Sequence, residues 1–354
     1  MKRRLAYLAV QCLAILVTVS GYAQQFPAPR VFHLTGDIAG THDPAIIKQG
    51  DTWYVFATGR APQGQLPIRC SKDLEQWKLC GQVFESVPDW IRTQSPDTKD
   101  LWAPDVSYFN GKYHVYYAFS AFGKNTSGIA LVTNKTLDSS STEYHWRDEG
   151  LVLRSRAEDD FNAIDPNVVF DSSGHAWLSF GSFWTGIKMR RIDPGTGKLS
   201  GEDTELYSLA GRERPRDASP GSSNLPPNWQ AIEAPFIIRH DDFYYLFVSF
   251  DLCCRGIKST YRTMVGRSRT VTGPYQDAGG KPMMQGGATP LLVGNARWFG
   301  PGGESILQGP EGDIIVFHAY DGKSGRPALQ ISPLVWSNGW PHAALADDSG
   351  MESK

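Results

Sequence analysis

The unit that decides the fold is clearest in residues 165–180, which read DPNVVFDSSGHAWLSF. An apolar, β-branched run follows the Asp-Pro pair, and a turn of small and polar residues that contains Gly174 comes next. A second run of aromatic and aliphatic residues completes the unit. Two such runs joined by a tight turn predict a β-hairpin. The same order of features recurs at four other places, so the hairpin is one copy of a repeat.

The other copies begin at Asp43-Pro44, Ala103-Pro104, Ala234-Pro235 and, in a degenerate form, Gly303-Glu304. Successive copies are about 60 to 70 residues apart. A single sheet cannot bury both of its faces, whereas sheets stacked around an axis can. We therefore predict an all-β chain folded as a five-bladed β-propeller. A pair of ordinary β-sandwiches is the alternative, but it does not explain the common step.

The first strand of each propeller blade lines the central channel. Proline suits the start of that strand because it cannot donate a hydrogen bond to the ladder. The residues beside the prolines should therefore approach the axis, and two of them, Asp43 and Asp165, are carboxylates. Glu233 lies one residue out of phase, so we expect a local irregularity in its strand. Carboxylates converging on an aromatic-lined channel are typical of glycoside hydrolysis, which uses one protonated and one ionised carboxyl group.

The first residues have the pattern of a secretory signal peptide. A basic start, Met1-Lys2-Arg3-Arg4, is followed by an apolar run to about Val19 and then by small residues. We expect residues 1–23 to be removed on export, to the periplasm or outside the cell. An N-terminal membrane anchor is the alternative, but the run is short for a spanning helix. No later stretch is long and apolar enough to span a membrane, so we expect no membrane association after cleavage.

The composition of the remaining chain excludes some classes of partner. Removing residues 1–23 takes away three positive charges and no negative ones, so the formal net charge goes from −2 to −5. With no basic patch, nucleic acid is not an expected partner. The mild charge favours a neutral substrate, and an aromatic content of 12% supplies flat faces that stack on sugars.

The cysteines leave two questions open. Cys12 lies in the predicted signal peptide, and an exported chain can form disulfides. A Cys70–Cys80 bridge would close a short loop. The adjacent pair Cys253-Cys254 could form an eight-membered ring or remain two buried thiols.

Several strings of the chain occur together in one known family. They are residues 42–44, 101–105, 161–167, 181–187, 231–235, 253–256, 259–261 and 318–321. In this order they resemble the arabinan endo-1,5-α-L-arabinosidases of glycoside hydrolase family 43. The resemblance covers about residues 33 to 340. It implies a five-bladed propeller that cleaves internal 1,5-α-L-arabinofuranosidic linkages of arabinan with inversion.

The resemblance also implies the roles of individual residues. Asp43 would be the general base, Glu233 the general acid, and Asp165 the residue that tunes the acid and orients the sugar. Asp43 and Asp165 would also contact substrate, as would residues of four further stretches, with Trp102 and Phe122 as aromatic platforms. These further substrate contacts would be Trp102, Phe122, Gly123, Asn162, Ala163, Ile164, Ser182, Phe183 and Trp184.

His318 is the candidate metal ligand. The resemblance implies that it binds one calcium ion near the centre of the channel, with waters completing the shell. Calcium generally prefers oxygen ligands. The alternative is a neutral histidine that is hydrogen-bonded to a carboxylate.

The motifs of the chain also bear on three alternative functions. An exo-acting arabinanase or arabinofuranosidase, or a xylosidase-like relative, is the nearest alternative. A non-catalytic carbohydrate-binding propeller would usually have lost one of the three carboxylates, and an invertase-type enzyme would carry an Asn-Asp-Pro motif where this chain has His42-Asp43-Pro44.

We expect a monomer with one catalytic domain at residues 24–342, a long loop at 212–229, and a disordered tail at 343–354.

Overall fold

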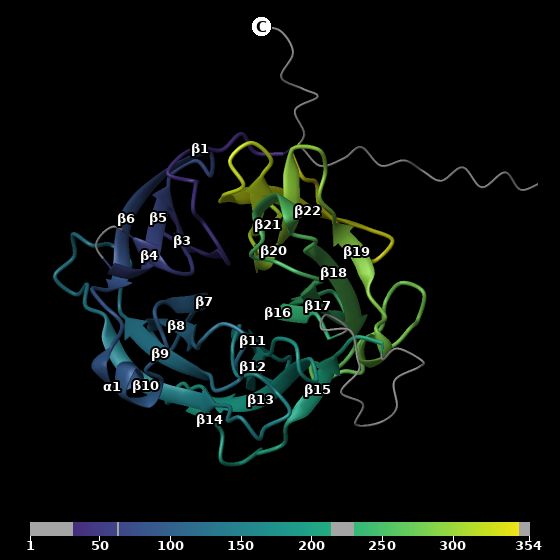
Figure 1. Ribbon diagram of the computed structural model, residues 1–354, viewed down its shortest axis with the longest axis horizontal. Helices are drawn as coiled ribbons and strands as arrows, with labels where there is room; N and C mark the ends of the chain where they lie inside the picture. Colours follow the sequence, from purple (N-terminus) through teal and green to yellow (C-terminus); the bar gives the residue numbers. More distant parts are fainter. Residues whose placement is uncertain (1–30, 62–63, 214–229, 347–354) are drawn as a thin grey trace, which may run out of the picture.

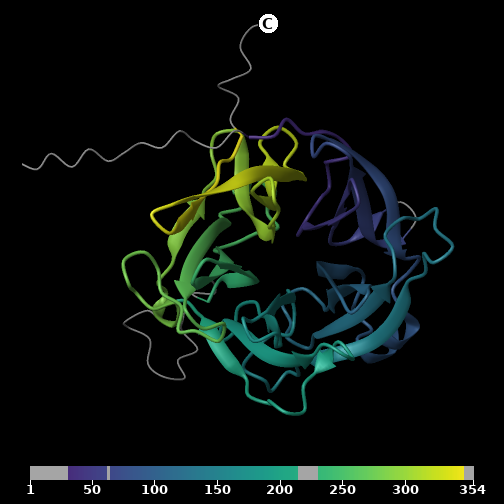
Figure 2. The ribbon, with the colours of Figure 1, turned by 180° about the vertical axis from the view of Figure 1, so that it is seen from behind.

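The computed structural model describes residues 31–61, 64–213 and 230–346, which form five mainly antiparallel sheets around one axis (Figure 1). Seen from behind, the same five sheets enclose the centre (Figure 2). The predicted five-bladed β-propeller is therefore confirmed, and the sandwich alternative is wrong. The predicted signal peptide, most of the predicted loop at 212–229, and residues 347–354 lie outside the described residues.

The first two blades follow the repeat closely. In the first blade the strand order is β1-β6-β5-β3-β2, β4 pairs with β5, and β1 pairs with β6 in parallel. Its strands are β1 Thr35–Gly36, β2 Ala45–Gln49, β3 Thr52–Phe56, β4 Arg60–Ala61, β5 Gly64–Ser71 and β6 Gln76–Phe84. A short helix, α1 (Asp89–Gln94), leads to the second blade, in which the order is β10-β9-β8-β7. Its strands are β7 Leu101–Phe109, β8 Lys112–Phe119, β9 Gly128–Asn134 and β10 Arg147–Arg154.

The other three blades continue in chain order. In the third blade the strand order is β11-β12-β13-β14, and β15 also pairs with β13. Its strands are β11 Asn167–Phe170, β12 Ala176–Phe180, β13 Ile187–Asp193, β14 Lys198–Leu199 and β15 Tyr207–Ala210. The fourth blade holds β16 Ile232–His240, β17 Phe243–Phe250, β18 Arg262–Ser268 and β19 Thr289–Leu292, with 3-10 turns at η1 (Gly256–Lys258) and η2 (Met283–Gln285). The fifth holds β20 Trp298–Leu307, β21 Asp313–Asp321, β22 Pro327–Ser337 and β23 Trp340–His342.

The innermost strands are the first strands of the repeats, as predicted. β2, β7, β11, β16 and β20 contact one another in that order, and β20 contacts β2 to close the ring. Among the described residues, a separate cluster of buried apolar side chains fills each of the five junctions between neighbouring blades. The core is thus distributed around the ring, because each sheet buries one face against each neighbour.

Side chains just after Pro104 and Pro166, and Ser305 at the equivalent place in the fifth repeat, tie neighbouring blades together. The Val168 N–H donates to Asp105 Oδ2 (3.0 Å), and the Ile237 N–H donates to Asn167 Oδ1 (2.9 Å). The Ile46 N–H donates to Ser305 Oγ in the same way (3.0 Å). Each bond joins the first strand of one blade to the first strand of the next. The buried Asp105 carboxyl group, whose pKa burial raises to about 7, therefore has a structural role.

Asn167 is central to this ring of bonds, because its Nδ2 also donates to Asp105 Oδ1 (3.1 Å). Replacing Asn167 by alanine would leave the buried Ile237 N–H and one Asp105 oxygen without partners. We expect the free energy of unfolding to fall by about 2–4 kcal/mol, measured by denaturant unfolding. Gln308→Ala removes a single exposed hydrogen bond and should cost less than about 0.5 kcal/mol. Equal losses in the two variants would contradict this role.

The two ends of the described chain pack against the fifth blade. Leu329 N–H donates to Ile38 O (3.0 Å), which attaches the N-terminal segment to β22. At the other end, Ala344 N–H donates to Ser332 Oγ and Asn295 Nδ2 donates to Ala346 O, both at 2.9 Å. Residues 344 and 346, near the start of the predicted tail, therefore contact the fifth blade, while residues 347–354 lie outside the described residues.

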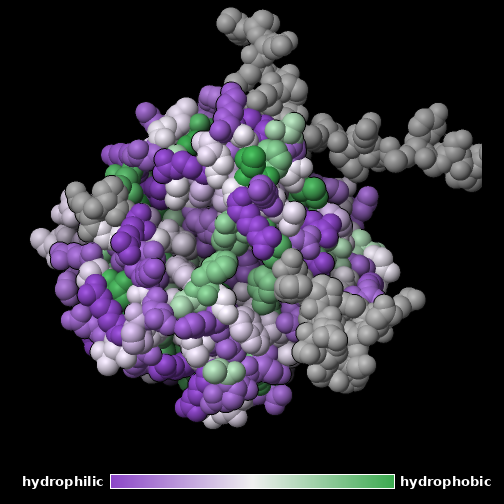
Figure 3. Space-filling model, viewed as in Figure 1, coloured by the Kyte–Doolittle hydropathy of each residue, from purple (hydrophilic) through white to green (hydrophobic). Residues whose placement is uncertain are grey.

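One face of the propeller has a distinct surface. A band of apolar residues crosses its middle, over the ring of inner strands, while its rim is mainly hydrophilic (Figure 3).

Candidate active site

Five equivalent residues of the repeat, which lie just before or within the inner strands, share an unusual backbone. All have positive φ angles: Asp43 (46°), Ala103 (38°), Asp165 (57°), Ala234 (53°) and Gly303 (60°). Only the last is a glycine, and left-handed backbone costs other residues about 1–2 kcal/mol each. Such conformations often cluster at functional sites because the surrounding structure holds them in place.

The left-handed residues interrupt the strands that contain them. The register shifts between Trp102 and Asp105 in β7, between Glu233 and Phe236 in β16, and between Gly302 and Ser305 in β20. β2 and β11 begin only after the equivalent residue. The irregularity expected at Glu233 is confirmed, and it proves to be a feature of the whole repeat. A bulge re-aims side chains, which lets the carboxylates of residues 43, 165 and 233 meet although one is out of phase.

Asp43 is held as an anion. Thr58 Oγ1 donates to its Oδ2 (2.6 Å), and the Ala103 N–H donates in turn to Thr58 Oγ1 (2.6 Å). Burial alone would raise the pKa of Asp43, but the neighbouring histidines and the Thr58 hydroxyl outweigh burial and hold the pKa at about 2. An ionised carboxylate is what activation of a water molecule requires.

Glu233 is surrounded by hydroxyl donors. Ser182 Oγ donates to Oε2 (2.6 Å), and Tyr261 OH donates to Oε1 (2.7 Å). Burial raises the pKa of Glu233 more than these two hydrogen bonds lower it, and the charge of Asp43 adds to the rise. Ser182 comes from the loop after β12, so the third blade positions a side chain of the fourth.

Asp165 completes the group. Its Oδ2 accepts one hydrogen bond, from the Ala234 N–H (3.1 Å). Burial raises the pKa of Asp165 well above its usual value, and the charges of Glu233 and Asp43 raise it further. Because both members of the Asp165–Glu233 pair have raised pKa values, the pair retains a proton under conditions in which Asp43 is ionised.

Two histidines adjoin the Asp43 carboxylate. His42 Nδ1 lies 2.9 Å from Asp43 Oδ2, at hydrogen-bonding distance although outside hydrogen-bonding geometry. Burial disfavours protonated His42, but the Asp43 and Glu233 charges outweigh burial and raise its pKa. The His42 ring stacks on the fully buried His318 ring, with centroids 3.8 Å apart. Burial lowers the pKa of His318 well below its usual value, so His318 is neutral.

The channel below the carboxylates is narrow. The left-handed residues and the residues that follow them line a void of about 30 Å³, room for one or two waters. Asp43 and Asp165 line this void, whereas Glu233 does not. Two glycines of the fifth blade make space beside it. A Cβ on Gly302 would lie 2.3 Å from the Tyr261 ring, and one on Gly303 would lie 2.5 Å from Asp43 Oδ1.

The predicted substrate contacts occupy different kinds of position. Phe122 is 84% exposed, and Gly123 beside it has open space around it. Trp102 is half-buried directly before the left-handed Ala103. Phe183 and Trp184, both with positive φ, follow Ser182. Trp184 also lines a cavity of about 480 Å³.

The stretch at residues 162–164 is buried. Ala163 has no exposed surface and packs in the core between the second and third blades, so its side chain cannot reach a ligand. Ile164 is 8% exposed. Asn162 is also buried, but no described residue makes a hydrogen bond to its Oδ1.

Other residues of the site were absent from the predicted set. They are Thr58, Tyr261, His42 and Tyr320. His42, Tyr261 and Tyr320 lie in strings that carry the family resemblance, at residues 42–44, 259–261 and 318–321. Thr58 follows a strand of the first blade and had no sequence signal.

Known proteins resemble this chain over most of its length. Residues 38–341 match the family described as glycosyl hydrolases family 43. An extracellular endo-α-(1→5)-L-arabinanase of Bacillus subtilis is 43% identical over 302 residues, 85% of this chain and 86% of that protein. An extracellular exo-α-(1→5)-L-arabinofuranosidase of Cellvibrio japonicus is 42% identical over 319 residues, 88% of both. The solved structure of a Cellvibrio cellulosa α-L-arabinanase complexed with arabinohexaose superimposes with a TM-score of 0.79 at 41% identity, covering 87% of this chain and 96% of that one.

Proposed function

The chain belongs to family 43 of the glycosyl hydrolases, and from this we propose that it hydrolyses internal 1,5-α-L-arabinofuranosidic linkages of arabinan with inversion. The observation that carries the proposal is the division among three carboxyl groups in one channel. The pKa of Asp43 is lowered to about 2, while those of Asp165 and Glu233 are raised. A reaction that needs a base and an acid at the same time uses such a division.

In the proposed reaction Asp43 removes a proton from a water molecule as that water attacks the anomeric carbon. Thr58 occupies Asp43 Oδ2, which leaves Oδ1 for the water. Glu233 gives its proton to the oxygen of the departing sugar. It precedes the left-handed Ala234, does not line the narrow void and is partly exposed. The negative charge of Asp165 favours the protonated form of Glu233. Asp165 also orients the sugar ring.

Gly303 is expected to be essential for the placement of Asp43. In a Gly303→Ala variant the new Cβ would meet Asp43 Oδ1 at 2.5 Å and His318 Nδ1 at 2.9 Å. A displaced base should lower kcat on linear arabinan about 100-fold. Gly174→Ala is the matched control, because Gly174 also has a positive φ (82°) but lies in a hairpin turn with nothing within 4 Å. Wild-type kcat in the Gly303 variant would contradict this placement.

The mode of cleavage has a specific competitor. The Bacillus relative is named an endo-arabinanase and the Cellvibrio relative an exo-arabinofuranosidase, at nearly equal identity. Chromatography of the products from debranched arabinan separates the two modes. Endo action predicts a mixture of oligosaccharides at the earliest times, with a rapid fall in viscosity. A single small product from the start would replace our assignment with exo action.

We also propose that His318 binds one calcium ion in the channel. In support, no described residue makes a hydrogen bond to its buried Nε2, and a buried polar atom without a partner fits a site for a bound group. If Nε2 is the ligand, the ring hydrogen must lie on Nδ1, so the Asp43 N–H, which is 3.2 Å from Nδ1 and donates to it here, would give up that hydrogen bond when calcium binds. Asp43 is the carboxylate grouped with His318, so waters would supply most of the oxygen ligands. A bound calcium ion would contribute positive charge beside the carboxylates.

Calcium binding can be tested without measuring hydrolysis. We expect the melting temperature of chelator-treated protein to rise when calcium chloride is added, and calorimetry to give one site per chain. His318→Gln should abolish both effects. An unchanged melting temperature and no binding heat in the wild-type protein would contradict the calcium site.

We propose that the enzyme is exported and acts as a monomer. In support of export, both relatives are named extracellular. No helix in the described ranges is long and apolar enough to cross a membrane. In support of a monomer, one chain closes the ring of inner strands. Detection of the enzyme in the culture medium or the periplasm, and light scattering of the purified protein, test these two points.

A further inference from the structure

The loop after β17 contains a disulfide between the adjacent residues Cys253 and Cys254. The sequence left this ring open as one of two possibilities, and the structure contains it. The neighbouring backbone holds the ring in place, because the Thr260 and Tyr261 N–H groups donate to Leu252 O (2.9 and 3.1 Å). Cys254 is exposed and has a left-handed φ of 66°.

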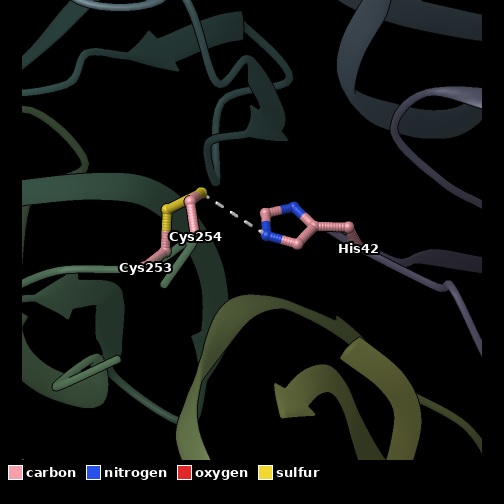
Figure 4. A group of neighbouring side chains, drawn as sticks. All are labelled: His42, Cys253 and Cys254. Atoms are coloured by element: carbon pink, nitrogen blue, oxygen red, sulfur yellow. Dashed lines mark hydrogen bonds between the residues drawn. A yellow bond between two sulfur atoms is a disulfide. The ribbon is translucent and has the colours of Figure 1, made fainter. Parts of the chain in front are cut away.

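The disulfide lies next to the histidine that adjoins the proposed base (Figure 4). Cys254 Sγ is 3.8 Å from His42 Nε2. The Cys254 N–H donates to the hydroxyl oxygen of the buried Tyr320 (2.8 Å), and that hydroxyl is 2.9 Å from His42 Nε2. Cys254 therefore contacts His42 both directly and through Tyr320.

The directions of these hydrogen bonds determine where His42 carries a hydrogen. The Cys254 N–H can only donate, so the Tyr320 oxygen accepts and its own hydrogen can go to His42 Nε2. Neutral His42 then has its hydrogen on Nδ1, and protonated His42 has one there too. In both states the His42 nitrogen that lies 2.9 Å from Asp43 Oδ2 carries a hydrogen.

The position of the His42 ring depends on these contacts. Its 2.9 Å contact with Asp43 Oδ2 lacks hydrogen-bonding geometry, so the ring needs further contacts to hold it beside the carboxylate. The stacked His318 ring supports one face, and the Tyr320 hydroxyl and Cys254 sulfur lie at Nε2. We propose that the Cys253–Cys254 disulfide is a positioning element for the general base, acting on Asp43 through Tyr320 and His42. This proposal rests on the proposed role of Asp43.

Reduction of the ring should disturb this arrangement. A dithiol reductant gives two electrons and two protons to the Cys253–Cys254 bond, which becomes two thiols, while the reductant forms its own disulfide. Cys254 is then no longer confined to a left-handed conformation that L-residues avoid, and its N–H can turn away from Tyr320. We expect kcat to fall about tenfold, part of the contribution of a general base, with KM changed less than about twofold.

The experiment compares the native protein before reduction, after reduction with dithiothreitol, and after reoxidation, using linear arabinan. Mass spectrometry of alkylated peptides identifies which bridge has opened. Cys70→Ser/Cys80→Ser is the matched control, because this second disulfide lies between β5 and β6 of the first blade. The control should keep wild-type kcat and the same response to the reductant. Cys253→Ser/Cys254→Ser should show the lower kcat from the start and no response.

Tyr320→Phe distinguishes positioning from general loosening of the loop. Without the hydroxyl, kcat should fall, and opening the ring should then have little further effect, because both changes interrupt one chain of contacts. If Tyr320→Phe and opening of the ring each lowered kcat by the same factor whether or not the other change was present, the proposal would be overturned. Wild-type kcat after confirmed opening of the Cys253–Cys254 ring would also overturn it. If Asp43→Ala is inactive while reduction has no effect, the proposed base stands and the positioning role fails. If Asp43→Ala is active, the proposed function itself fails.

Discussion

Replacing Glu233 by glutamine should lower kcat/KM on linear arabinan on the order of 1,000-fold. Glutamine has nearly the same shape and can still contact Ser182 and Tyr261, but it has no proton to give to the departing sugar. An arabinoside with a nitrophenol leaving group needs little protonation, so its hydrolysis should fall far less. The wild-type enzyme should lose activity as the pH rises above the raised pKa of Glu233, because the acid is then ionised. This loss should be absent in Glu233→Gln.

The control for this variant is Asp105→Asn. Asp105 is also a buried carboxyl group with a raised pKa, but it ties the second blade to the third and does not belong to the reacting group. It should change stability and leave kcat near the wild-type value. Equal losses on arabinan and on the nitrophenyl substrate in Glu233→Gln would contradict the role of Glu233 as the acid.

Replacing Asp43 by asparagine should lower kcat on both substrates to a similar extent, on the order of 1,000-fold. Attack by water needs the base whatever the leaving group is. Asparagine can still accept the hydrogen bond from Thr58, so the fold should persist. Steady-state kinetics on both substrates, with circular dichroism to check the fold, measure this outcome.

The two variants test each other. A loss confined to arabinan in Asp43→Asn, with a uniform loss in Glu233→Gln, would exchange the two roles. Near-wild-type turnover by either variant would contradict the assignment of acid and base altogether.

The repeat made the architecture predictable from the sequence. Its first strands became the inner ring, because a hairpin pattern at a constant step has few ways to bury both faces of each sheet. Asp43 and Asp165 could be assigned to the channel from their phase beside a proline. Glu233 needed the family resemblance, and its predicted strand irregularity is present.

Other features depended on contacts between distant parts of the chain. A residue before proline is expected to be extended, so the left-handed backbone at Asp43, Ala103, Asp165 and Ala234 could not be anticipated. Hydroxyl partners such as Thr58 and Tyr261 carry no periodic pattern, since a single hydrogen bond decides their role. The burial of Ala163 shows the limit of a resemblance, which implies that a stretch contacts substrate without saying which of its side chains are accessible.

The most direct test of the proposed chemistry is the anomeric configuration of the first product, followed by proton NMR during the opening minutes of hydrolysis of linear arabino-oligosaccharides. Direct attack of a water activated by Asp43, opposite a leaving group protonated by Glu233, predicts that the new reducing end appears first as the β-anomer and then mutarotates. Initial appearance of the α-anomer would show retention through a covalent intermediate and would contradict the proposed roles of both carboxylates.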